Sequence, residues 1–516
     1  MLLFGYERDF EMIRIPKIKF VNDGTYVCMP RTEFASYAAD TDEATFKALN
    51  TNFDVTLNGN ICEVRECRVS AMPYNRPWPG KQRQYNQSES AGFISFSADE
   101  SVTVKVKSKK TFASAQIRPK SKNIVTEIND GEVVFTLEKP GNYVLELDDE
   151  HNVLHIFFNP IKEYKDAKKS TYFFGPGLHY PGIIYLRDND TVYIDENAIV
   201  FGSINTLGAK NVKIFGGGVV DNSCEERVTE NAYENHAKGN FRIYNSENIE
   251  ISDVIFTNSC TWAMSMFNCS NIRIDNVKIV GHWKYNTDGI DIVNSDNVSI
   301  SNSFIRSFDD TITIKAVYDY QKPVENITVD NCVMWCGWGK NCEIGIETAG
   351  IEYKNITFKN CDLVHNMVAA FAISNGNHAD MHDICFENIN VELQYEMTAQ
   401  LQTEDGKTYD VGNNKTTVPL LVKNSNEQYA IRQKTPVGIV RKKSEKWGNI
   451  HNVVYRNINI ITEGENIKPE VVIESHNSEV KFDNFLFDNV YVDGKKQTDF
   501  DGFYTRFANS DNIVIK

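Results

Sequence analysis

Two clusters of aspartates lie one after the other in the middle of this 516-residue chain. Asp288 and Asp291 occur in YNTDGIDIVNS, and Asp309 and Asp310 occur in FIRSFDDTITIK, with Asp309 21 positions after Asp288. Crowded carboxylates raise the pKa of one member, which then remains a protonated acid near neutral pH. Glycoside hydrolysis needs such an acid and a second carboxylate, about 6.5–9.5 Å apart in inverting enzymes because a water must fit between them.

Either cluster alone is typical of a turn, but the two together, one repeat apart, indicate an active site. Adjacent strand residues point to opposite faces, so Asp309 and Asp310 can share one cleft only across a bend or bulge. We therefore predict Asp288, Asp309 and Asp310 as catalytic residues, with an irregular backbone at the pair.

A degenerate repeat positions these clusters. Each of its units has a short alternating strand, a polar corner and a second short strand, and the units begin at Asn211, Asn248, Asn271, Asn297, Asn326, Asn355, Asp383, Asn452 and Asn484. Several successive starts lie 23 to 29 residues apart, about one turn of a parallel β-helix. One coil cannot bury its apolar residues alone, whereas stacked coils share a core. Asn suits the corners because it tolerates left-handed backbone angles.

The predicted fold class is all-β, a right-handed parallel β-helix over residues 166–516 preceded by an N-terminal β-sandwich over residues 1–165. The first 165 residues lack the repeat and show alternating strands such as SVTVKVKS and EVVFTLE between turns such as NDGE and KPGN, typical of an antiparallel sandwich. An insertion at about 395–448 is longer than a corner and is interpreted as a lid, a partner surface or a disordered loop.

Composition excludes several classes of protein. The formal net charge of −16 disfavours nucleic-acid partners, and no stretch approaches the ~20 apolar residues of a membrane span. The N-terminus lacks the apolar region of a secretory signal, so we expect a cytoplasmic hydrolase of imported oligosaccharides. The 11 cysteines are expected to be reduced, mostly buried thiols, and the spacing of Cys332, Cys336 and Cys342 matches no zinc pattern. We expect no metal and no cofactor.

NTDGIDI followed by SFDDTITIK resembles the signature of the polygalacturonase family and of the related dextranase and isopullulanase family. The resemblance implies inverting hydrolysis on a right-handed parallel β-helix. It assigns Asp309 as the general acid, Asp288 and Asp310 as the residues that hold and activate water, and Asn286 to the same cluster. A β-sandwich ahead of the helix looks more like the dextranase type.

Two departures from the polygalacturonase pattern bear on the sugar. Polygalacturonases carry Gly-His-Gly one coil after the aspartate pair and then an Arg-x-Lys that grips the galacturonate carboxylate. Here the first place holds Gly337-Trp338-Gly339, and no Arg-x-Lys follows. A uronate without a counter-charge is costly to desolvate. With the acidic net charge, this favours a neutral sugar; the alternative is a polygalacturonase-type hydrolase of galacturonides.

Further side chains near the aspartates could bind the oligosaccharide or polysaccharide substrate, or could serve packing alone. They are His282, Trp283, Asn286, Asp291, Lys315, Trp338 and Glu347, with Glu343, His365 and His378 as weaker candidates. Lys315 either reaches a sugar hydroxyl or pairs with the aspartates. Arg76 and Trp78, in the loop YNRPWPGKQRQ, either fold over the helix mouth or pack between domains.

Two other functions stay open, a β-helix polysaccharide lyase and a glycan-binding protein without activity. A lyase needs calcium or a basic residue to neutralise a uronate, whereas this site is rich in carboxylates. Pure binding gains little from crowded carboxylates. Linkage, endo or exo action and a homo-oligomeric state are left open by the sequence.

Overall fold

The computed structural model describes residues 13–17, 25–27, 45–47, 49–70, 88–225, 239–284, 286–317, 322–394, 396–397, 402–404, 407–409, 416–417, 420–428, 431–435, 438–442, 444–464 and 467–516. The loop with Arg76 and Trp78 lies outside these residues, so its predicted roles remain predictions.

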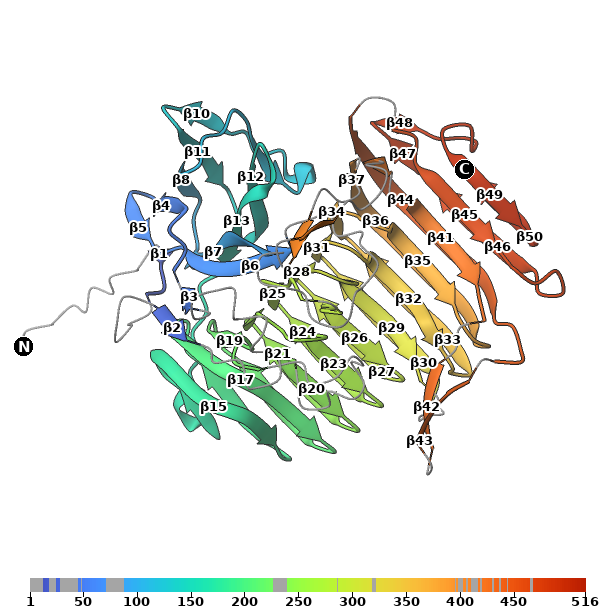
Figure 1. The fold of residues 1–516 in the computed structure, drawn as a ribbon, viewed down its shortest axis with the longest axis horizontal. Coiled ribbons are helices and arrows are strands. Elements are labelled where there is room, and N and C mark those ends of the chain that lie inside the picture. Colours follow the sequence, from blue (N-terminus) through green and yellow to red (C-terminus); the bar gives the residue numbers. More distant parts are fainter. Residues whose placement is uncertain are drawn as a thin grey trace, which may run out of the picture.

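A parallel β-helix begins at β14 (Tyr172–Phe174) and continues to β50 (Ser510–Ile515), which confirms the main element of the predicted fold (Figure 1). Its coils place strands on three faces. The first sheet includes β20 (Phe241–Tyr244), β23 (Met264–Phe267), β26 (Ile290–Val293), β29 (Ile312–Ala316), β32 (Lys340–Thr348) and β35 (Ala369–Asn375). The second includes β21 (Glu247–Ser252), β24 (Ser270–Asp275), β27 (Asp296–Ser301), β30 (Val324–Asp330), β33 (Glu352–Lys359) and β36 (Asp380–Gln394). The third includes β22 (Ile255–Thr257), β25 (Lys278–Val280), β28 (Phe304–Ser307), β31 (Val333–Cys336) and β34 (Asp362–His365).

Alternation along each strand builds the core of the helix. In β26, Ile290 and Ile292 are buried in the shared hydrophobic cluster, and they pair in register with Ile312 and Ile314 of β29. The intervening residue Asp291 points to the outer face, because successive side chains on a strand alternate. The same pairing therefore stacks apolar residues inside and polar residues outside, coil after coil.

Asparagine ladders hold the corners. Asn248, Asn271, Asn297 and Asn326 all have positive φ, between 53° and 58°, as predicted for the start of each unit. Each donates a side-chain hydrogen bond to the equivalent residue of the preceding coil, over 3.0 to 3.2 Å. The amide both allows the left-handed corner and joins neighbouring coils.

The N-terminal region contains two sheets that share one hydrophobic cluster. One comprises β1 (Ile13–Arg14), β6 (Arg65–Ser70), β7 (Ser88–Ala98), β9 (Ala115–Arg118), β12 (Gly141–Leu147) and β13 (Asp149–Asn159). The other comprises β4 (Phe53–Leu57), β5 (Asn60–Cys62), β8 (Val102–Ser108), β10 (Glu127–Asn129) and β11 (Glu132–Leu137). The prediction of a purely antiparallel arrangement was wrong in one respect, because β13 pairs parallel with β7. Between these two strands the chain passes through β8, β10 and β11 of the other sheet and through β9 and β12 of this one, and β13 follows β12 as its antiparallel neighbour.

The third sheet of the β-helix packs against the N-terminal region. Phe157 of β13 lies 5.2 Å, between ring centroids, from Phe304 of β28, within a cluster drawn from both parts of the chain. A buried ion-pair network lies at the same junction, and its components are Arg118, Glu146, Glu392 and Glu463. The Nε atom of Arg118 lies 2.5 Å from Glu146 Oε2.

The predicted insertion at about 395–448 is not wholly separate from the helix. Within it, β41 (Leu420–Asn426) pairs in parallel with β35 and with β45 (Glu470–Glu474), so it supplies one strand of the first sheet. A hairpin of β42 (Ile431–Thr435) and β43 (Gly438–Lys442) follows it. The sequence interpretation missed β41 because no Asn-led repeat precedes it.

Helices are scarce in the described part of the chain. It contains the short 3-10 helices η2 (Lys120–Lys122) and η3 (Ala167–Lys169). None of its helices has the length and apolar character that crossing a membrane requires.

Candidate active site

Three successive turns between the third and first sheets form the site, and the first two carry Asp288 and the Asp309–Asp310 pair. Among the described residues these turns comprise 281–284 with 286–289, then 308–311 and 337–339, and they lead into β26, β29 and β32 respectively. Backbone hydrogen bonds join one turn to the next: Gly289 N–H donates to Asp310 O over 2.9 Å, and Thr311 N–H donates to Lys340 O over 3.0 Å. The two aspartate clusters are therefore on adjacent coils, as their spacing predicts.

The Asp309–Asp310 pair lies in a bend between β28 and β29, which meets the condition for both side chains to face one side. A Cβ atom added at Gly339 would lie 2.3 Å from Asp310 Oδ1 and 2.7 Å from Asp309 Oδ1. Both carboxylates thus lie against the same glycine of the next turn. Asp310 Oδ1 also accepts the backbone N–H of Lys340 over 2.8 Å, and Asp309 Oδ1 accepts the N–H of Asp310 over 3.0 Å.

Lys315 holds the other cluster together. Its Nζ atom lies 3.0 Å from Asp288 Oδ2 and 2.8 Å from Asp291 Oδ1, and all three side chains are almost fully buried. Thr313 adds a hydrogen bond to Asp291 Oδ1 over 2.7 Å. Asn286 approaches Asp288 Oδ1 at 3.4 Å, at the long end of the hydrogen-bond range. Of the two roles predicted for Lys315, the structure shows the pairing with the aspartates.

Burial and the repulsion of neighbouring carboxylates raise the pKa of Asp309 and of Asp288. Burial first, and then the neighbouring Asp310, raise the pKa of Asp309 to about 7, although Lys315 and Lys340 oppose the shift. Burial also raises the pKa of Asp288 well above its usual value, again against the effect of Lys315. A carboxyl group that is still protonated near neutral pH is what a general acid requires. Asp309 therefore has the property that its predicted role demands.

The predicted aromatic and histidine residues differ from one another in burial. Trp338 is half-buried and stacks on Phe308, with ring centroids 5.6 Å apart. Trp283 and His282 are almost fully buried, and burial lowers the pKa of His282 to about 3. Glu347 is half-buried on β32, and none of the described contacts links its carboxylate to the aspartates.

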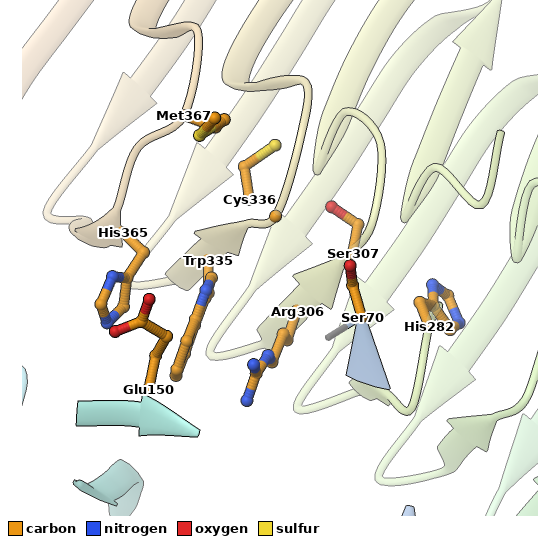
Figure 2. Close-up of a pocket in the computed structure, with 10 residues that line it drawn as sticks. Ser70, Glu150, His282, Arg306, Ser307, Trp335, Cys336, His365 and Met367 are labelled. Carbon is orange, nitrogen blue, oxygen red and sulfur yellow. The ribbon is translucent and has the colours of Figure 1, made fainter. Parts of the chain in front are cut away.

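A pocket at the junction with the N-terminal region lies next to this site, and Ser307 and Gly337 are among its lining residues. Figure 2 shows Trp335 between Arg306 and His365, with Glu150 of β13 nearby. The guanidinium of Arg306 lies 3.5 Å from the Trp335 ring centroid, and the His365 ring stacks at 4.0 Å. His365 Nε2 lies 2.5 Å from Glu146 Oε1, so this histidine is bonded to the N-terminal region. The weaker prediction for His365, a place along the groove of the aspartates, does not match this arrangement.

Lys340 is a residue of the site that the sequence analysis missed. It follows Gly339 directly, and its Nζ atom lies 3.2 Å from Glu343 Oε1 beside the aspartate pair. The sequence contains a signal for Lys340. This lysine directly follows the third turn, one coil after the aspartate pair, so it begins β32 next to Asp310. Among the described residues, no group of three or more His, Cys, Asp or Glu side chains is arranged to hold a metal ion.

Fold and site together define the class: a parallel β-helix of the polygalacturonase-like type, with aspartates stacked on adjacent coils. Residues 184–424 match the model of a family described as Glycosyl hydrolases family 28. Rhamnogalacturonase A of Emericella nidulans is 28% identical over 162 residues, which are 30% of this chain and 30% of that protein. An exopolygalacturonase of Cochliobolus carbonum is 30% identical over 197 residues, 33% of this chain and 43% of that protein. The chain thus spans less than half the length of these relatives.

The solved structure of Dex49A from Penicillium minioluteum shares the fold, with a TM-score of 0.54, 13% identity and coverage of 89% of this chain and 86% of that one. At this identity the likeness concerns the fold alone. The predicted resemblance to polygalacturonase-like β-helix hydrolases is confirmed, and so is the predicted enzyme class, an inverting O-glycosyl hydrolase, for the matched segment. The activity of the whole chain is a proposal.

Proposed function

We propose that this protein is an inverting glycoside hydrolase that acts on a uronate-containing polysaccharide of the pectin type. The observation that carries the proposal is the Asp309–Asp310 pair, one coil from Asp288, in which Asp309 has a pKa of about 7. The fold alone would not support it, since one fold serves many functions.

The reaction follows from the placement of the three carboxyl groups. Asp309 donates its proton to the glycosidic oxygen as the bond from that oxygen to the anomeric carbon breaks. Asp310 and Asp288 hold a water on the opposite face, and one of them takes its proton as the water oxygen bonds to the anomeric carbon. The product then has the inverted anomeric configuration, and the proton balance is closed when Asp309 and the base exchange a proton with solvent.

The comparisons favour the alternative substrate over the neutral sugar. The neutral sugar was inferred from the missing Arg-x-Lys and from the net charge of −16. The relatives that match are named as a rhamnogalacturonase and an exopolygalacturonase. The charge of a whole surface is a poor guide to one site, because exposed charges more than about 10 Å away are largely screened. Lys315 and Lys340 lie within the site itself.

The test is hydrolysis of a panel of uronic and neutral oligosaccharides, with the product anomer followed by NMR. We expect turnover of a galacturonide, inverted product, and a loss of about 10³-fold or more in Asp309→Asn, at the upper range for one acid–base group. Asp54→Asn is the matched control, because Asp54 is 69% exposed on the N-terminal region. An unsaturated product that absorbs in the ultraviolet would indicate a lyase instead. Glycan binding without any product would indicate a binding protein.

Several finer statements belong to the proposal as well. We propose that residues 1–165 form a β-sandwich domain, and the two sheets with a common core support this. The substrate contacts of His282, Trp283, Trp338 and Glu347, the cytoplasmic location and a homo-oligomer stay predictions. A folded, monomeric fragment 1–165 would support the domain boundary, and an unfolded one would count against it.

A further inference from the structure

We infer that Lys340 binds the carboxylate of the uronic residue next to the scissile bond. The inference rests on the proposed function, and it names the residue that would form an ion pair with the carboxylate of the substrate. Lys340 is the first residue of β32 and directly follows Gly337-Trp338-Gly339. It would supply the positive charge that an Arg-x-Lys motif, absent here, would otherwise supply.

The position of Lys340 is fixed by the aspartate pair. Its backbone N–H donates to Asp310 Oδ1 over 2.8 Å, and its carbonyl accepts from Thr311 N–H over 3.0 Å. The side chain thus begins at a backbone position that is hydrogen-bonded to the Asp310 carboxylate. Asp309 and Asp310 also act on the charge of the Lys340 ammonium, so a sugar held against the pair would lie near this side chain.

The ammonium group keeps donor capacity for a ligand. Lys340 carries three N–H donors on Nζ. Its one ion pair among the described residues is with Glu343 Oε1, at 3.2 Å, and the side chain of Glu343 is fully buried while that of Lys340 is 18% exposed. Burial opposes the charge, but Glu343, Asp310 and Asp309 outweigh it and raise the pKa of Lys340 above its usual range. The ammonium is therefore charged and paired with a buried carboxylate, while part of the Lys340 side chain remains exposed to solvent.

The other cationic side chains near the site, Lys315 and Arg306, already have partners within the protein. Lys315 is only 5% exposed, lies between Asp288 and Asp291, and faces the Trp262 ring at 4.0 Å. Arg306 stacks on Trp335 in the pocket behind the turn. A uronate beside the aspartates would be repelled by their charge, and a partly exposed ammonium at the same place offsets that repulsion.

The experiment compares kcat/KM for an oligogalacturonide and for its methyl ester, in which the carboxylate is neutral. We expect Lys340→Met to lower the value for the free acid by about ten- to a hundred-fold, the range for one charge-assisted hydrogen bond, with little change for the ester. Lys340→Arg should restore much of the preference for the acid. Lys354→Met is the control, since Lys354 pairs with Glu352 at 2.6 Å on the second sheet, away from the site.

The outcomes separate this inference from the proposed function. An equal loss on acid and ester would mean that Lys340 acts only through Asp310, and unchanged activity on both would mean that it binds no carboxylate; either result overturns the inference. If the wild type cleaves neither substrate, the proposed function fails. The inference is then decided by calorimetric binding of the same two ligands to wild type and Lys340→Met: equal affinity of the wild type for acid and ester overturns it, and a preference for the acid that the variant loses supports it.

Discussion

Replacement of Asp309 by asparagine should make the protein more stable as well as inactive. In the folded protein the pKa of this carboxyl group is raised from 3.8 to about 7, chiefly by burial and by Asp310. At 1.36 kcal/mol for each pKa unit, ionising it in place costs at most about 4 kcal/mol. The side chain is not fully buried, so water reduces the cost, and we expect Asp309→Asn to gain about 2–4 kcal/mol at pH 8.

The sign of the pH dependence follows from the raised pKa. Between pH 4 and 7 the folded protein keeps a proton on Asp309 that the unfolded chain has lost, so the stability of the wild type falls as pH rises through this window. Asparagine does not titrate. The advantage of the variant should therefore be near zero at pH 4, grow up to about pH 7 and stay constant above it.

Thermal unfolding of both proteins at pH 5 and pH 8 measures this difference. For a chain of 516 residues the gain corresponds to about 2–4 °C in Tm at pH 8, and to less at pH 5. Asp54→Asn should shift Tm by much less at either pH, because Asp54 is exposed. A variant that is less stable than the wild type at pH 8, or a difference that does not depend on pH, would refute the reasoning that Asp309 is held protonated by its surroundings.

Three further outcomes are expected. The rate kcat should fall as pH rises through about 7, because Asp309 then loses the proton it donates; a pH–rate profile that is flat from pH 6 to 9 would contradict this assignment. Gly339→Ala should lose at least about 10²-fold in kcat, since its Cβ would lie 2.3 Å from Asp310 Oδ1; circular dichroism checks that the variant is folded. Arg118→Met should destabilise the protein by about 3–5 kcal/mol, because it leaves Glu392 and its neighbours buried without their cation; a denaturation midpoint equal to that of the wild type would show that the network does not stabilise the fold.

Much of the fold was accessible to sequence reasoning because the β-helix repeats its local rules. Asn297 and Asn326 mark corners by residue type and spacing, and both have the left-handed φ that this role requires. The Asp309–Asp310 pair was accessible for the same reason, since one coil separates it from Asp288. The irregular backbone at Asp309 and Asp310 was a stated condition, and the structure meets it with a bend.

Other features depend on distances that the repeat does not encode. His365 bonds to Glu146, which is 219 residues away in the chain, so no local pattern could place it at the junction. The sequence places Lys340 directly after the third turn but does not single it out, because its place beside Asp310 comes from a contact between neighbouring coils and not from an Arg-x-Lys motif. The neutral-sugar prediction relied on the charge of the whole chain, whereas recognition depends on a few groups within several ångströms of the ligand.

The backbone hydrogen bonds between the three turns make the spacing of the aspartates independent of the side chains that surround them. The spacing of the aspartates is set by hydrogen bonds such as Gly289 N–H to Asp310 O, which do not depend on the side chains that meet the sugar. The side chains of Trp338 and Lys340 can therefore be replaced without loss of the backbone hydrogen bonds that fix the spacing of the aspartates. The coil that carries Gly337, Trp338 and Gly339 is thus a place where substitutions would change the surface beside the aspartates without changing the distance between the coils.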